Sequence, residues 1–117
     1  MQIDIQARHL SLTGSLRRYV ERRLKFAMKR CDEHIQRLVI RLSDINGPRG
    51  GSDKQCHIQV VMAGMPDVVI EDTRTDIYAA IHRALDRAAQ VVSRKINRRQ
   101  KRHKHVVSRF LPVEMNS

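Results

Sequence analysis

Four stretches of the chain are expected to be β-strands: hydrophobic and polar residues alternate in the first three, which is the pattern of half-buried strands, and the fourth follows a tight turn. These stretches lie at residues 2–7, 35–45, 56–62 and 68–73. Between the first two stretches, and again after the fourth, hydrophobic residues recur every three or four positions, as on one face of an amphipathic helix. The first such row comprises Leu16, Val20, Leu24 and Ala27, and the second comprises Ile77, Ile81, Ala84, Leu85, Ala88 and Val92. The predicted order of elements is therefore β-α-β-β-β-α.

Polar residues that can cap a helix precede both helical rows. Ser11 or Thr13 can cap the first helix, since either hydroxyl can accept a hydrogen bond from a free backbone N–H of the first turn. This helix is expected to run to about Arg30. Thr75 is expected to cap the second helix, with Asp76 in the first turn, where negative charge suits the helix dipole.

The connections between the predicted strands favour a mixed sheet. Residues 46–53 are rich in glycine and residues 64–67 form a tight turn, so both segments are expected to join antiparallel neighbours. The first strand reaches the second through a helix, and such a crossover makes the two strands parallel if they are neighbours. Each helix has one hydrophobic face. The fold class is therefore expected to be α+β, with a four-stranded mixed sheet and both helices on one side.

The length of 117 residues corresponds to one domain. In the second helix the hydrophobic row thins out after Val92, and Lys95 and Arg99 take positions that would otherwise face the core, so the helix is expected to overhang the sheet. After His105 no period is visible, and Pro112 disfavours a continued helix. We therefore expect a binding domain at residues 1–105 and a flexible C-terminal tail at residues 106–117.

The charge of the chain is strongly positive, with 23 Lys and Arg against 12 Asp and Glu and a formal net charge of +11. About 41% of the residues are hydrophobic, which is too many for a disordered basic tail. The cations form two rows at helical spacing with few acids among them, and the candidate RNA-binding residues are Arg18, Arg22, Lys25 and Lys29 in the first helix and Arg83, Arg87, Arg94, Arg98 and Lys101 in the second. Such one-sided rows favour a polyanionic partner over simple solvated faces.

RNA is preferred over DNA as this partner, because the sequence has no helix-turn-helix pattern and no zinc-ligand spacing. Aromatic residues make up only 3% of the chain, so contacts with phosphates and with the shape of the RNA are expected to dominate over base stacking. Tyr19 and Tyr78 lie at the edges of the hydrophobic rows, and we assign both to core packing.

Other functional classes lack support in the sequence. We find no paired carboxylates, catalytic triad or phosphate-binding loop, so no enzymatic activity, cofactor or small-molecule substrate is expected. Cys31 and Cys56 are interpreted as ordinary reduced thiols, and the six histidines show no metal-ligand spacing. No run of 18 apolar residues and no secretory signal are visible, which predicts a cytoplasmic location and no membrane partner.

Four acidic residues surround the fourth strand, namely Asp67, Glu71, Asp72 and Asp76. Helix capping and protection of the sheet edge explain them without a functional role. The alternative is a surface that repels RNA, and so orients docking, or that meets a basic protein.

Two stretches resemble a known family. MQIDIQARHLSLTGSLRRYVERRL at residues 1–24 and EDTRTDIYAAI at residues 71–81 are similar to the signature stretches of the ribosome hibernation promoting factor and ribosome-associated inhibitor family, also called sigma-54 modulation proteins. The resemblance covers roughly residues 1–100. It implies a fold similar to double-stranded-RNA-binding domains, a partner in the small ribosomal subunit, and a site in the channel of messenger and transfer RNA.

The resemblance also bears on individual residues. Arg22, Lys25, Arg87 and Arg94 match positions where the family commonly has Lys or Arg, and the family's basic helical residues contact ribosomal RNA. Arg8, Asp76 and Tyr78 match signature positions that have a structural interpretation. Residues 106–117 are too few for the ribosome-pairing domain of long members, which indicates the short form.

The sequence therefore predicts a monomeric hibernation factor that docks on the small subunit through ribosomal RNA and inhibits translation. Two alternatives remain open. One is a structured-RNA or ribosome-assembly binding protein without an inhibitory role. The other is a regulator of a sigma factor, which would require a specific protein-binding surface.

Overall fold

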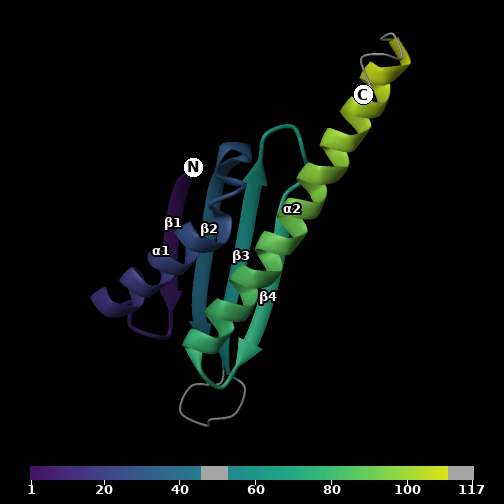
Figure 1. The fold of residues 1–117 in the computed structure, drawn as a ribbon. Coiled ribbons are helices and arrows are strands. Elements are labelled where there is room, and N and C mark those ends of the chain that lie inside the picture. The colour runs from purple at the N-terminus through teal and green to yellow at the C-terminus, as the bar shows by residue number, and fades with distance from the viewer. Residues whose placement is uncertain (46–52, 111–117) are drawn as a thin grey trace.

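The computed structural model describes residues 1–45 and 53–110, with side chains as far as Lys101. The elements are β1 (Gln2–Arg8), α1 (Gly14–Met28), a 3-10 turn η1 (Asp32–His34), β2 (Ile35–Asp44), β3 (Lys54–Met62), β4 (Val68–Arg74) and α2 (Ile77–Phe110). Figure 1 shows the four strands side by side, with α1 and α2 packed on the same face of the sheet. The predicted α+β class and the order β-α-β-β-β-α are confirmed.

The strand order in the sheet is β1-β2-β3-β4, the same as in the sequence. β1 is parallel to β2, and the other two pairs are antiparallel, as the connections predicted. One row of registered isoleucines crosses the sheet beneath the helices: Ile5, Ile40, Ile58 and Ile70. All four are buried, so the sheet presents a continuous apolar surface to the two helices.

The residues that the helices bury belong to the hydrophobic rows identified in the sequence. Val20 and Leu24 of α1 and Ile81 and Leu85 of α2 are at most 1% exposed. The opposite face of the sheet is mostly polar but includes three valines, Val39, Val61 and Val69. Val39 alternates with the core residues Leu38 and Ile40 and so points to the solvent side, yet it is only 5% exposed. Longer side chains border it, since Gln59 and Asp4 are its register partners.

The cap of α1 was predicted correctly and the cap of α2 was not. Thr13 Oγ1 accepts a hydrogen bond from the backbone N–H of Leu16 at 3.1 Å, so Thr13 is the cap of α1. In α2 the side chain of Asp76 accepts a hydrogen bond from the backbone N–H of Tyr78 at 3.1 Å. The helix starts at Ile77, which makes Asp76, rather than Thr75, the capping residue.

α2 extends beyond the end of the sheet, as Figure 1 shows. The last core contact among the described side chains is Ile96, 7% exposed, and Arg99 then donates a hydrogen bond from Nη1 to the carbonyl oxygen of Ala63 at 2.9 Å. The helix ends at Phe110, five residues past the boundary that we expected at His105. The absence of an apolar period predicts exposure but not termination, and a helix breaker comes only with Pro112.

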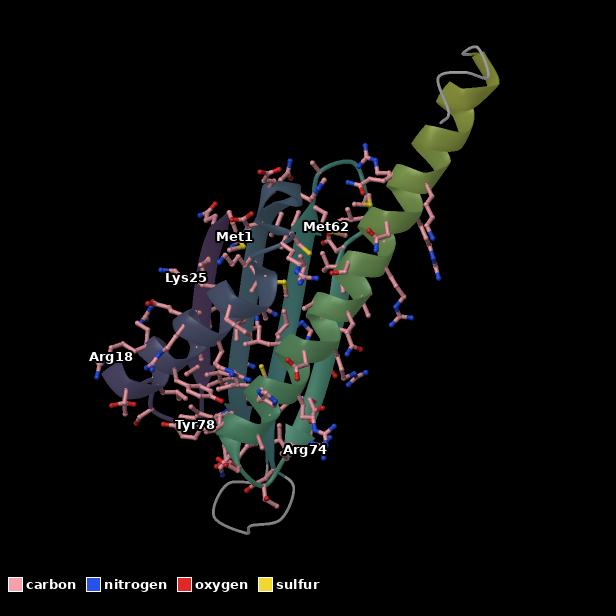
Figure 2. All side chains as sticks on the ribbon, viewed as in Figure 1. Met1, Arg18, Lys25, Met62, Arg74 and Tyr78 are labelled. Atoms are coloured by element: carbon pink, nitrogen blue, oxygen red, sulfur yellow. The ribbon has the colours of Figure 1, made fainter. Side chains whose placement is uncertain are left out.

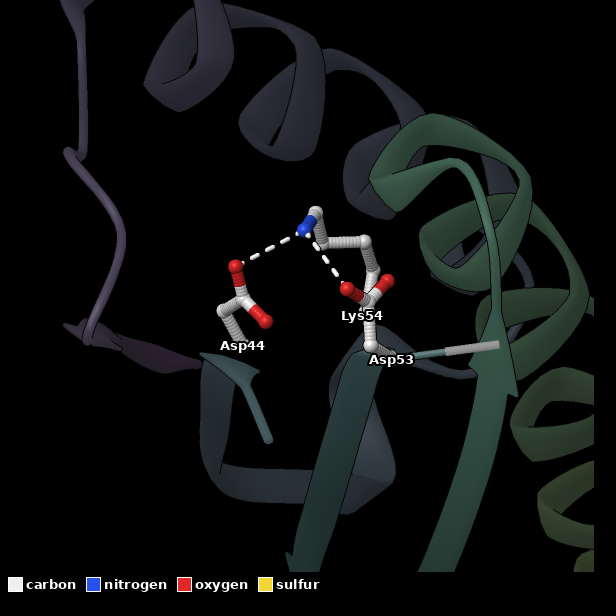
Figure 3. A network of polar contacts seen from close by, with 3 residues as sticks. All are labelled: Asp44, Asp53 and Lys54. Atoms are coloured by element: carbon white, nitrogen blue, oxygen red, sulfur yellow. Dashed lines mark hydrogen bonds and ion pairs between the residues drawn. The ribbon is translucent and has the colours of Figure 1, made fainter. Parts of the chain in front are cut away.

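A polar network with one buried carboxylate, that of Asp53, lies at the end of the sheet where the chain leaves β2 and enters β3 (Figure 3). Lys54 Nζ donates to Asp44 Oδ2 at 2.8 Å and to Asp53 Oδ2 at 3.3 Å. The hydrogen bond to Asp44 is the main cause of a raised pKa for Lys54. Asp53 is 2% exposed, so this shared ammonium group stabilises a carboxylate that would be costly to bury alone. Most of the glycine-rich segment, residues 46–52, lies outside the described residues.

Both cysteines are free and buried. Burial raises the pKa of Cys56 to about 12, and the nearby carboxylate of Asp72 adds to the shift. A thiol with this pKa stays protonated at neutral pH and is a poor nucleophile or metal ligand. This agrees with the interpretation of Cys56 as an ordinary core residue.

The Cys56 thiol should make the stability of the domain fall at alkaline pH. The pKa of this thiol is higher in the folded state than in the unfolded state. Its contribution to the free energy of unfolding is therefore complete below the unfolded-state pKa of about 9 and is lost as the pH rises toward 12. One such proton corresponds to about 1.4 kcal/mol per pH unit. Urea unfolding of the natural protein and of Cys56→Ala between pH 8 and 11 should give a shallower pH dependence for the variant. Equal slopes would contradict this assignment.

Candidate nucleic-acid interface

The two predicted cationic rows lie on the solvent side of the helices. All nine side chains, from Arg18 to Lys29 on α1 and from Arg83 to Lys101 on α2, are exposed. Figure 2 shows Arg18 and Lys25 projecting from α1 away from the sheet. The periodicity therefore placed these cations correctly, because the same helical spacing that buries one face must expose the opposite one.

Arg87 differs from the other eight cations because it also holds α2 to the sheet. Its Nη1 donates a hydrogen bond to the carbonyl oxygen of Glu71 at 3.0 Å and lies 3.8 Å from Asp72 Oδ2. The Asp72 side chain is 6% exposed and accepts a second contact from Arg74 Nε at 2.7 Å, which raises the pKa of Arg74. Arg87 thus helps to balance a buried carboxylate, and only part of its charge is available to a partner.

The acidic residues around β4 have structural partners. Asp72 pairs with two arginines, Asp76 caps α2, and Asp67 accepts a hydrogen bond from Gln59 Nε2 at 2.7 Å. Glu71 lies 2.7 Å from His57 Nδ1. These contacts favour capping and sheet-edge protection over the alternative of an acidic docking surface.

An open groove of about 1200 Å³ separates α1 from α2. It is lined by Phe26 and Ala27 of α1, by Lys29 and Arg30 directly after α1, and by Asp86, Ala89, Gln90, Ser93, Arg94 and Asn97 of α2. Lys29 and Arg94, which belong to different predicted rows, therefore lie at one site. Alanines from both helices form part of the groove, and the charged residues among its polar rim are mainly cations. We call this region the interhelix groove.

Contacts between α1 and α2 at both ends fix the interhelix groove. Near the start of α2, the rings of Tyr19 and Tyr78 meet edge to face with centroids 4.8 Å apart. Tyr19 packs against the core as predicted, whereas Tyr78 is 40% exposed, so its assignment to core packing was wrong. Figure 2 places Tyr78 at this end. Arg23 donates a hydrogen bond to Nδ1 of His82. Where α1 ends, Cys31 Sγ lies 3.4 Å from Ser93 Oγ. The spacing of the helices, and with it the groove, is therefore set by specific side chains.

Sequence reasoning missed most of the residues that line the interhelix groove, notably Phe26 and Arg30. Phe26 is 79% exposed, although phenylalanine is a typical core residue. The sequence did indicate that Phe26 is exposed, because on a helical wheel it lies roughly 110° from the centre of the hydrophobic row of α1. Arg30 follows the last turn of α1 and was taken only as the end of the helix. Its role at the groove depends on the position of α2, which no local pattern specifies.

The uncovered face of the sheet is less cationic than the helical face. Arg37 pairs with Asp4 at 3.3 Å, and Arg41 lies in register with His57, whose other neighbour is Glu71. The cations of this face are thus partly balanced by carboxylates. The helices present the stronger attraction for a polyanion.

Within the part of the chain that the structure describes, no group of three or more His, Cys, Asp or Glu side chains is arranged to hold a metal ion. None of the described helices is long and apolar enough to cross a membrane.

Comparison with known protein families identifies the family of this chain. The chain belongs to the family described as Sigma 54 modulation protein / S30EA ribosomal protein, whose model matches residues 3–104. This is a ribosome-associated and non-enzymatic family, which confirms the resemblance seen in the two signature stretches and the prediction that the chain is not an enzyme. A search among curated protein sequences gave no match.

Solved structures support the same assignment. The crystal structure of the Thermus thermophilus Protein Y N-terminal domain is 33% identical, with a TM-score of 0.67 over 80% of this chain and 98% of that domain. A ribosomal subunit interface protein from Coxiella burnetii has a TM-score of 0.68 over 83% of this chain and 99% of its own. Because its identity is only 16%, this second likeness bears on the fold alone.

Proposed function

We propose that this protein docks on the small ribosomal subunit through ribosomal RNA and silences translation by occupying the channel of messenger and transfer RNA. It acts as a hibernation factor without a cofactor or a substrate, and it works in the cytoplasm as a monomer. Family membership supports association with the ribosome. The nine cations of the two rows form the docking surface, with Arg87 contributing less because of its contacts with β4.

The observation that carries this proposal is the unbalanced charge of the helical face. Among the described residues, eight of the nine cations make no ion pair, and Arg87 is the exception. A folded domain with such a surface repels itself, which favours a monomer, and it attracts phosphates strongly because each contact releases condensed counterions. Ribosomal RNA offers phosphates at a density that matches two long helical rows.

Binding to 30S subunits should depend steeply on salt. With on the order of five or more phosphate contacts, the affinity should fall at least about 100-fold between 50 and 200 mM salt. Co-sedimentation of the protein with purified 30S subunits at a series of salt concentrations measures this directly. A flat salt response, or preferential sedimentation with 50S subunits, would contradict the proposal.

Inhibition of translation distinguishes the proposed function from its two alternatives. A hibernation factor should stop cell-free translation when it is equimolar with ribosomes, whereas an assembly or structured-RNA binding protein should bind without stopping it. A sigma-factor regulator should act in a transcription assay that contains no ribosomes. The cationic surface favours the first two functions over the third, since a polyanion fits it better than a specific protein surface.

A further inference from the structure

We propose that the interhelix groove holds one unpaired nucleotide of the bound RNA, with the base stacked on the phenyl ring of Phe26. This inference rests on the proposed function and deepens it, because it names the kind of RNA element that the helices recognise. It also amends the expectation that contacts go only to phosphates and shape. The base contributes one anchoring contact, and the surrounding cations hold the backbone.

The first step is the position of the Phe26 ring. It is 79% exposed and lines the interhelix groove, and within the described part of the chain the one ring pair is that of Tyr19 and Tyr78. The fold therefore gains little from this phenyl group. An aromatic ring that folding leaves in water has a free face on which a base can stack.

The second step is the charge beside this ring. Lys29 and Arg30, which directly follow α1, and Arg94 of α2 line the same groove and are exposed. None of the three pairs with a described carboxylate. Their positive charges converge on one space from two helices, so an anionic group is the complementary occupant.

The third step is the polar part of the groove contributed by α2. Gln90 and Asn97 offer both hydrogen-bond donors and acceptors, and Asp86 offers a carboxylate that also lies 3.4 Å from His82 Nε2. An amide can pair with the edge of a base, and a carboxylate can accept from an exocyclic amino group. A ring, a cationic rim and amides together fit a nucleotide better than a bare phosphate or an apolar peptide.

The nucleotide has to be unpaired. In a double helix both faces of each base are already stacked on neighbouring bases, and the deep, narrow major groove of A-form RNA does not admit side chains. A base in a loop or bulge can turn outward and place one face on the phenyl ring. The interhelix groove is open to solvent, so the RNA backbone can pass outside it while the base is inserted.

Fluorescence provides a direct test, because the chain contains no tryptophan. The Phe26→Trp variant introduces a single indole that can still stack with a base. Titration with a single-stranded RNA oligonucleotide should quench this fluorescence, and a blunt duplex of the same sequence should quench it much less when both are saturating. Equal quenching by the two RNAs, or none by either, would overturn the inference.

Affinity measurements separate stacking from charge. Phe26→Ala should weaken binding of the single strand by roughly 5- to 100-fold, and Phe26→Tyr should retain it. The dependence on salt should keep its slope in Phe26→Ala, because no phosphate contact is lost. Lys29→Gln should instead reduce that slope by about 0.7. Val69→Ala, which truncates another exposed hydrophobic residue on the far face of the sheet, is the matched control and should change neither quantity.

Parallel measurements with 30S subunits distinguish failure of this inference from failure of the proposed function. If Phe26→Ala matches the natural protein on both single-stranded RNA and 30S subunits, the stacked nucleotide is wrong while ribosome docking stands. The natural protein could instead fail to bind 30S subunits and still bind single-stranded RNA, with an aromatic ring required at position 26. In that case the assignment of the groove is correct and the proposed ribosomal function is wrong.

Discussion

Reversing three charges on α2 should abolish docking on the small subunit and leave the domain folded. The variant carries Arg83→Glu, Arg94→Glu and Arg98→Glu, three exposed cations that make no described ion pair. Each exchange removes two units of charge, so the formal net charge falls from +11 to +5. Affinity for 30S subunits should drop on the order of 1000-fold, since attractive phosphate contacts become repulsive. Co-sedimentation and cell-free translation report the loss.

Arg87 is left unchanged in this variant because its contacts with Glu71 and Asp72 stabilise the fold. The matched control is Arg8→Glu, Arg37→Glu and Arg41→Glu on the uncovered face of the sheet, which gives the same net charge of +5. If net charge alone governs binding, both variants fail equally. If the helical surface is the interface, the control retains most of its affinity, provided that thermal melting confirms both folds.

Leu85→Ala should destabilise the domain and leave its docking surface intact. Leu85 is 1% exposed on the buried face of α2, so truncation removes packed methyl groups and leaves a cavity. The free energy of unfolding should fall by about 2–5 kcal/mol. For a domain of this size the melting temperature should drop by roughly 10–20 °C. Binding to 30S subunits, measured well below the new melting temperature, should remain close to that of the natural protein.

Leu85→Met provides the control for this second prediction, because it keeps the volume of the side chain and should cost less than about 1.5 kcal/mol. If Leu85→Ala lost ribosome binding while fully folded, the two faces of α2 would not be independent. The separation of docking face and core face would then be wrong.

The fold could be predicted in detail because its elements have clean periods. Period two identified the first three strands, the tight turn at residues 64–67 indicated the fourth, and the crossover through α1 predicted the parallel pairing of β1 with β2. The errors were local. Asp76 rather than Thr75 caps α2, a difference of one position that depends on where the first helical turn closes. The end of α2 was misplaced because the loss of an apolar period does not by itself end a helix.

The candidate site was only partly predictable. A helical period determines which side chains face water, so the two rows were identified correctly as exposed. The interhelix groove depends on how far apart α1 and α2 lie, and that distance follows from contacts between distant residues, such as Tyr19 with Tyr78. The bond between Arg87 and β4 likewise requires the register of the helix on the sheet. Periodicity within one element carries no information about either.

The order of the strands has a consequence for how the chain folds. Ile58 faces Ile70 across 12 positions of sequence and Ile40 faces Ile58 across 18, whereas Ile5 faces Ile40 across 35. Closing a short loop costs less entropy, so the β3–β4 hairpin is expected to form first and β1 to join late. During synthesis β1 leaves the ribosome first, yet its only neighbour in the sheet is β2. The first strand to be synthesised is therefore expected to stay unpaired until β2 is available.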